Sequence, residues 1–227
     1  MHVVILILFI LALVLGPGLW VKAVMARYSH PADRYSKAGG ELARELLDYL
    51  GLKHVVAETV DSGDHYDPVK KAVRLTPANF EGHSLTAITV AAHEVGHALQ
   101  DARGFRPLKW RTRLVRWVGP IEKVGAGLLM ATPFVAALTR VPVVGLLTLL
   151  GGMLTLSSAT IVHFLTLPTE LDASFTRALP LLSHLRILQP GDGPKARRLL
   201  IAAALTYVSG SLMSLVNIAR WWAILRR

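Results

Sequence analysis

The sequence predicts a mainly α-helical protein that combines four membrane-spanning helices with a small cytoplasmic α+β domain. Apolar residues make up 52% of the chain although its formal net charge is +10, a combination that is unusual for a soluble basic domain. The charged and apolar residues occupy separate stretches of the sequence. Several apolar stretches are about as long as a helix must be to cross the ~30 Å hydrocarbon core of a bilayer. The polar stretches carry both helix and strand patterns.

The first apolar stretch, Val3 to Val21, contains no charged residue. It lacks the basic start of a secretory signal peptide, and Met25-Ala26-Arg27 is a poor cleavage site. The sequence therefore favours an uncleaved N-terminal anchor over a signal peptide that is removed.

The larger polar segment follows this anchor. Pro31 to Gly51 has an apolar stripe at helical spacing and ends in glycine, which predicts a helix. Val55 to Val60 and Ala72 to Thr76 are short β-prone stretches on either side of a turn. Ser84 is a suitable N-cap for a second helix, from Leu85 to Ala102.

Three further apolar stretches complete the predicted membrane bundle: Val118 to Leu138, Val141 to Leu167, and Leu199 to Ala219. Only Thr139 and Arg140 separate the first two, so we expect a tight helical hairpin. The chain is thus divided into five segments: an anchor (1–21), a cytoplasmic domain (22–117), a two-span hairpin (118–167), a cytoplasmic segment (168–198), and a fourth span with a C-terminal tail (199–227).

Charge distribution predicts the orientation and the partners. Lys and Arg are concentrated in segments 22–117 and 168–198, and basic loops stay on the cytoplasmic side of a membrane. We therefore expect a multi-pass protein of the cell membrane with both polar segments in the cytoplasm. No nucleic-acid motif or basic run with interleaved aromatic residues is present, so the lipid bilayer, and no nucleic acid, is the expected partner.

The strongest motif is His93-Glu94-Val95-Gly96-His97. Histidines four residues apart project from one face of a helix, at a spacing suited to two zinc ligands. Glu94 is placed to act as a general base towards a water at that metal. Gly96 removes a side chain beside the site, which leaves room for another backbone. The chain contains no cysteine, so any metal must be held by histidines and carboxylates.

A catalytic zinc usually has a third protein ligand, and Glu170 is the best candidate in the sequence. It follows the third apolar stretch, so the predicted hairpin returns it to the same side of the membrane as His97. Pro168 suits the start of a helix, and a carboxylate near a helix N-terminus is also favoured by the helix dipole. Spacing alone leaves the two interpretations of Glu170 equally open.

Four stretches carry a resemblance to a known family: Gly63 to Pro68, Val73 to Thr76, Ala91 to Gln100, and Thr166 to Ser174. They resemble the bacterial membrane zinc metallopeptidases of the YugP type, whose members carry Phe where this chain has Leu171. The resemblance implies a zincin-like domain that binds one Zn²⁺ per chain through His93, His97 and Glu170, with Glu94 as the catalytic residue.

The resemblance also suggests residues around the metal. Asp172 or Ser174 is expected to orient a ligand histidine. The usual spacing of such enzymes places an acid where this chain has Ser174, so the identity of the partner stays open. His65 and Tyr66 are candidates to stabilise an oxyanion, with a turn whose side chains merely pack as the alternative.

The stretch Val73, Arg74 and Leu75 is expected, by the same resemblance, to form an edge strand that binds extended substrate. An ordinary buried strand is the alternative. The implied function is a zinc-dependent endopeptidase acting on peptides or membrane proteins at the cytoplasmic face of the membrane. The competing hypothesis is a scaffold or adaptor in which zinc only joins two segments, with His65 or His184 as a fourth ligand.

Overall fold

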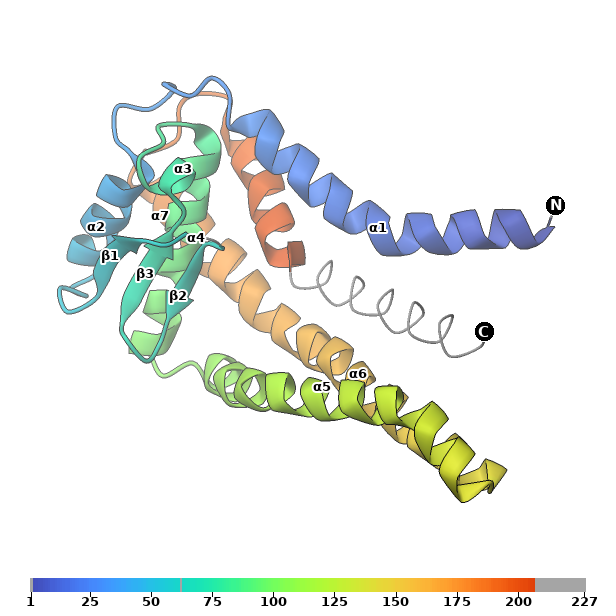
Figure 1. Cartoon of the computed structure of the whole chain (residues 1–227). Helices are drawn as coiled ribbons and strands as arrows, with labels where there is room; N and C mark the ends of the chain where they lie inside the picture. The colour runs from blue at the N-terminus through green and yellow to red at the C-terminus, as the bar shows by residue number, and fades with distance from the viewer. Residues whose placement is uncertain (1, 62, 207–227) are drawn as a thin grey trace. The chain divides into compact units, whose positions relative to one another are not determined.

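The computed structural model describes residues 2–61 and 63–206, which form two compact units. Among these residues, one unit comprises 2–18 and 110–166, and the other comprises 19–61, 63–109 and 167–206. The second unit contains every residue of the predicted metal site. It holds the sheet and the short helices, as the labelled elements of Figure 1 show.

Three long helices contribute to the first unit: α1 (His2–Tyr28), α5 (Arg106–Thr139) and α6 (Pro142–Leu171). Among the described residues, no helix is both long enough and apolar enough to cross a membrane. The predicted fold of four transmembrane helices is therefore wrong. The prediction counted uncharged residues along the sequence, whereas α5 joins an apolar stretch to a strongly basic one and α1 continues past Lys22 and Arg27.

The end of the predicted fourth span lies outside the described residues. Residues 193–206 are helical, and they include only the first part of the apolar stretch that begins at Leu199. The five-segment division of the chain stays a prediction.

The second unit, called the compact unit below, is built around a three-stranded sheet. Its strands are β1 (Val56–Thr59), β2 (His65–Asp67) and β3 (Ala72–Leu75). The strand order is β1-β3-β2, in which β3 pairs in parallel with β1 and antiparallel with β2. The two β-prone stretches of the sequence are confirmed as β1 and β3. The short β2 was not predicted, because its three residues fall in a turn-rich stretch.

Helices cover this sheet and supply most of the core. They are α2 (Gly39–Tyr49), α3 (Pro77–Phe80), α4 (Leu85–Ala102), the π-helix η1 (Asp172–Ala178) and α7 (Leu179–His184). Helix α4 packs against α2, the strands β2 and β3, and η1. It therefore occupies the centre of the unit, and its residues from Leu85 to Gln100 are all buried.

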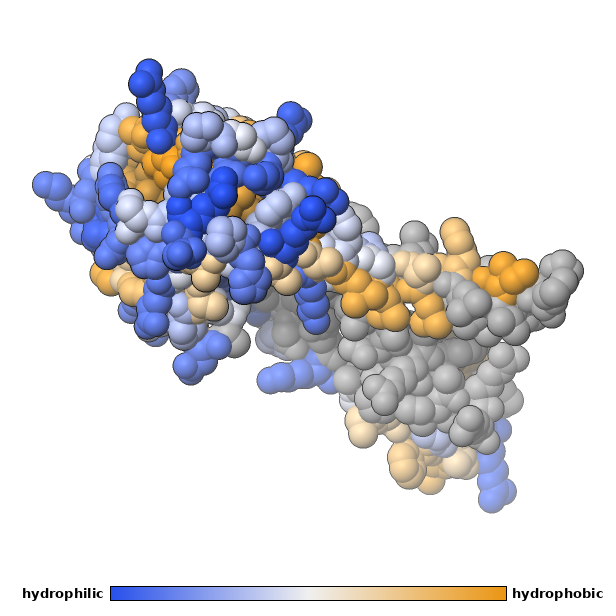
Figure 2. Space-filling view, turned by 90° about the horizontal axis from the view of Figure 1, so that it is seen from above, coloured by the Kyte–Doolittle hydropathy of each residue, from blue (hydrophilic) through white to orange (hydrophobic). Residues whose placement is uncertain are grey.

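The surfaces of the elements differ in polarity. In Figure 2 the compact unit is largely hydrophilic, with small hydrophobic spots. Large apolar side chains are exposed on the long helices, among them Phe9 on α1, Phe134 and Leu138 on α5, and Leu154 on α6. The long helices therefore carry apolar residues on their exposed surfaces as well.

Candidate metal centre

Helix α4 carries the two histidines. Its predicted bounds, Leu85 to Ala102, are confirmed, and the predicted cap is present because Ser84 Oγ accepts a hydrogen bond from the backbone N–H of Ala87 at 3.2 Å. His93 and His97 lie one turn apart, with their ring centroids 4.8 Å apart and their planes nearly perpendicular. Each is only 3% exposed, so the rings are held in the interior of the unit.

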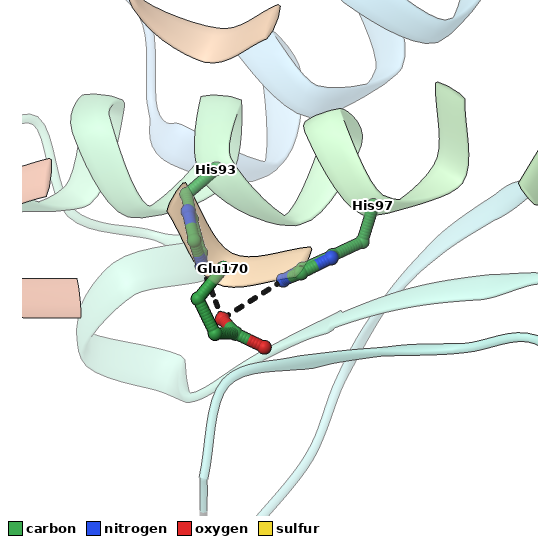
Figure 3. A group of neighbouring side chains, drawn as sticks. All are labelled: His93, His97 and Glu170. Atoms are coloured by element: carbon green, nitrogen blue, oxygen red, sulfur yellow. Dashed lines mark hydrogen bonds and ion pairs between the residues drawn. The ribbon is translucent and has the colours of Figure 1, made fainter. Parts of the chain in front are cut away.

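Glu170 reaches the same point from a second helix. Its Oε2 lies 3.3 Å from Nε2 of His93 and 3.2 Å from Nε2 of His97, and Figure 3 shows both rings directed at this carboxylate. The nitrogen and oxygen atoms that these three residues can offer to a metal all lie within 4.8 Å of one another. Two imidazoles and a carboxylate form a donor set that suits zinc.

Glu170 lies in the last turn of α6, and Pro168 is inside that helix. The expectation that Pro168 begins a new helix is therefore wrong, and so is the alternative of a carboxylate at a helix N-terminus. The helical path continues from α6 into η1. A π-helix is rare, and it commonly occurs at functional sites; here it begins two residues after Glu170.

His93 has a partner for its second ring nitrogen. Nδ1 of His93 lies 3.0 Å from Oγ of Ser174, and that hydroxyl donates to the backbone carbonyl of Leu200 at 3.2 Å. Because the hydroxyl proton is used by Leu200, Oγ accepts the proton of Nδ1–H. Nε2 of His93, which faces Glu170, is then the nitrogen that a bound metal would take.

Gln100 provides the corresponding contact for His97. Its Oε1 lies 2.9 Å from Nδ1 of His97, and its Nε2 donates to Oδ2 of Asp172 at 2.7 Å. Asp172 thus reaches a histidine only through the glutamine. Gln100 was not predicted as a site residue, although a residue three positions after His97 lies on the same helix face.

Asp172 has a second hydrogen-bond donor, the cationic side chain of Arg177. Arg177 Nε donates to Oδ2 of Asp172 at 2.6 Å. Burial alone would raise the pKa of this carboxyl, but the hydrogen bonds from Gln100 and Arg177 outweigh it and lower the pKa below its ordinary value. Asp172 is therefore a carboxylate acceptor at neutral pH.

Gly96 allows α4 and η1 to approach closely. A Cβ atom at this position would lie 2.7 Å from the carbonyl oxygen of Ala173, which is closer than two such atoms can pack. The interpretation that Gly96 leaves room for another backbone is confirmed. That backbone belongs to the segment that carries Glu170.

Strand β3 does not have the position that was expected of it. The stretch Val73, Arg74 and Leu75 was interpreted as an edge strand, but β3 is the middle strand and pairs on both sides. This interpretation is wrong because the β2 strand, missed in the sequence, covers its other edge. Val73 and Leu75 are fully buried, and Arg74 forms ion pairs with Glu58 and Asp67 on the two neighbouring strands.

The two oxyanion candidates are engaged elsewhere. His65 Nδ1 contacts the carbonyl oxygen of Gly63 at 2.8 Å, and the Tyr66 hydroxyl donates to Asp101 at 2.7 Å. Burial, together with the Asp101 carboxylate, raises the pKa of Tyr66. These contacts of His65 and Tyr66 lead to the turn and to the end of α4, and the roles of both residues towards an oxyanion stay predictions.

The buried helix with His93, Glu94 and His97, joined by a carboxylate from a second segment, defines the class: a zinc-peptidase-like centre of two histidines and one glutamate. Glu94 is also buried, at 6% exposed. The comparisons with known proteins agree with this class. Residues 3–226 match the family described as "Putative neutral zinc metallopeptidase", and the chain belongs to this family.

One curated relative covers almost the whole chain. The chain is 33% identical over 223 residues to "Putative membrane protease YugP" of Bacillus subtilis (strain 168), which is 95% of this chain and 95% of the relative. The resemblance to metallopeptidases of the YugP type is thereby confirmed. No solved structure matches the chain.

Proposed function

We propose that this chain is a zinc-dependent endopeptidase in which His93, His97 and Glu170 hold one Zn²⁺ and Glu94 is the catalytic base. The observation that carries the proposal is the convergence of the three buried side chains on one point, with each histidine's Nε2 turned towards it. The family of the chain supports the same assignment.

The number of ligands favours catalysis over a structural metal. Structural zinc sites have four protein ligands, whereas catalytic sites have three and keep one position open. Within the described part of the chain, the converging group has three members. His65 contacts the Gly63 carbonyl and His184 is exposed at the end of α7, so neither is placed as the fourth ligand that a scaffold would use.

Bound zinc supplies a Lewis acid that polarises the scissile carbonyl and lowers the pKa of a water to about 7. The carboxylate of Glu94 takes the proton of the attacking water and passes it to the leaving amine nitrogen. Its burial keeps this carboxylate away from bulk solvent. Ser174 and Gln100 keep the two rings in the tautomer that leaves Nε2 free of a proton.

The location of the activity is a separate part of the proposal. The relative's name contains the words "membrane protease", and we extend a membrane location, at the cytoplasmic face, to this chain. A net charge of +10 favours attraction to the anionic lipids of the cytoplasmic leaflet. Substrates at that surface would be peptides or the exposed segments of membrane proteins.

The test separates metal binding from cleavage. Glu94→Gln should retain one equivalent of zinc and lose hydrolysis of a casein or membrane-protein substrate, while the exposed Glu81→Gln should leave both unchanged. A scaffold would keep its zinc in both variants, and the unaltered chain would show no hydrolysis. Normal cleavage by Glu94→Gln would overturn the proposed mechanism.

A further inference from the structure

Gln100 lies outside the proposed ligand set and contacts both halves of the site. It lies on α4, three residues after His97, and its side chain is completely buried. Besides its bonds to His97 and Asp172, its Nε2 donates to the carbonyl oxygen of Thr169 at 2.8 Å. Thr169 directly precedes Glu170, so one amide group links a ligand histidine to the backbone of the ligand glutamate.

The surroundings of this amide determine which way it faces. An amide nitrogen can only donate and an amide oxygen can only accept. Thr169 O and the Asp172 carboxylate are both acceptors, so Nε2 must point at them. Oε1 is thereby directed at His97, and a ring nitrogen facing Oε1 must carry the proton.

The orientation of Asp172 is fixed in turn by Arg177. The guanidinium donates to Asp172 Oδ2 and lies over the ring of Phe105, 5.4 Å from its centroid. A cation over an aromatic face is attracted to it. Arg177 is 8% exposed and the Asp172 side chain 19%, so this chain of contacts is only partly open to solvent.

We propose that Gln100 is a positioning residue of the zinc centre, which fixes His97 in the Nδ1–H tautomer and ties it to the segment of Glu170, and that Asp172 and Arg177 act through its amide. The inference rests on the proposed function only in requiring that the site takes zinc. Partners of this kind raise metal affinity by about 10–100-fold.

The first experiment replaces Gln100 with Met, which keeps the length and removes the hydrogen bonds. In the full chain without metal, nitrogen NMR of the histidines should show a proton on Nδ1 of His97 before the change and a partial loss of that proton after it, with His93 unaltered. The zinc dissociation constant, measured by chelator competition, should rise about 10–100-fold. Gln189, the other glutamine of the chain, is exposed. Gln189→Met should therefore change neither the protonation of His97 nor the zinc dissociation constant.

Gln100→Glu distinguishes the two tasks of the amide. A glutamate keeps an acceptor for His97 but has no N–H for Thr169 O and repels Asp172. The tautomer of His97 should therefore persist while zinc binds more weakly. This variant also keeps the proposal testable if Gln100→Met does not fold.

The dependence on Asp172 is tested by a double-mutant cycle. Asp172→Asn should weaken zinc binding in the unaltered chain and have no further effect in Gln100→Met, because its influence passes through the amide. Additive losses would show that Asp172 acts independently and would overturn this part. Unchanged zinc affinity and His97 tautomer in Gln100→Met would overturn the whole inference, whereas an unaltered chain that binds no zinc would refute the proposed function instead.

Discussion

The α-carbon of Gly96 faces the carbonyl oxygen of Ala173 so closely that a Cβ atom on Gly96 would lie 2.7 Å from that oxygen. Gly96 is one residue before His97, and Ala173 is three residues after Glu170. The contact therefore sets how near the two segments of the metal centre can come. A backbone oxygen cannot move aside as the end of a flexible side chain can.

Gly96→Ala should push η1 away from α4 and separate Glu170 from the two histidines. We expect a loss of about 1–3 kcal/mol in the free energy of unfolding and zinc binding at least about 10-fold weaker. Thermal unfolding of the metal-free chain and chelator competition measure the two effects.

Gly127→Ala is the matched control, because Gly127 lies within α5 and a Cβ there would meet nothing within 4 Å. Alanine is the better helix former by about 1 kcal/mol, so this change should be neutral or stabilising. If Gly96→Ala behaved like Gly127→Ala, the close approach would have no energetic consequence.

The parts of the site that the sequence predicts are those set by local rules. The bounds of α4 follow from the Ser84 cap and an apolar stripe at helical spacing, and the proximity of His93 and His97 follows from a separation of four residues. These features depend on residues within one or two helical turns, so they can be predicted without knowing the rest of the fold. The backbone approach at Gly96 was also inferable, because a glycine inside a helix needs a packing reason.

The remaining features depend on contacts between distant segments. The partner strand β2 is three residues long and has no periodicity to detect, so the middle position of β3 was not predictable. The orienting role inferred for Gln100 requires Thr169 and Asp172, which are 69 and 72 residues away. Within the described residues, the predicted spans were wrong because uncharged residues were counted along the sequence without regard to the basic residues that α1 and α5 also contain.

Ser174→Ala should weaken zinc binding by removing the hydrogen-bond partner of His93. The buried Nδ1–H of His93 would lose its acceptor, and leaving such a group unpaired costs about 1–3 kcal/mol. Zinc affinity should fall about 10-fold or more, and the tautomer of His93 rather than that of His97 should become mixed. The exposed Ser183→Ala serves as the control, and equal zinc affinity in both variants would contradict the role of Ser174.

Glu170→Gln should remove the response of stability to zinc. A ligand that binds only the folded chain raises its stability in proportion to the logarithm of the metal concentration. We expect the unfolding temperature of the unaltered chain to rise with added zinc, and that of Glu170→Gln to stay level. Glu58→Gln, in the sheet, should respond to zinc as the unaltered chain does. A normal rise in Glu170→Gln would exclude Glu170 as a ligand.

The ionised carboxylate of Asp192 should contribute to the free energy of unfolding of the compact unit, and this contribution should be lost in acid. Its buried carboxylate accepts hydrogen bonds from Arg34 Nε at 2.6 Å, from the Tyr35 hydroxyl at 2.8 Å and from Lys195 Nζ at 3.0 Å. Burial alone would raise the pKa of Asp192, but these partners outweigh it and lower the pKa to about 2. Asp192 therefore binds a proton more weakly in the folded chain than in the unfolded chain, where an aspartate has a pKa of about 3.9.

The sign of the pH dependence follows from this difference. The stabilisation is fully present above pH ~4 and is lost as the pH falls through about 2. The free energy of unfolding of the metal-free chain, measured with urea between pH 6 and 2, should fall more steeply than that of Asp192→Asn, and the two curves should converge towards the acid end. The exposed Asp33→Asn should keep the steep slope. Parallel curves for the unaltered chain and Asp192→Asn would mean that the ion pairs at Asp192 do not couple its protonation to folding.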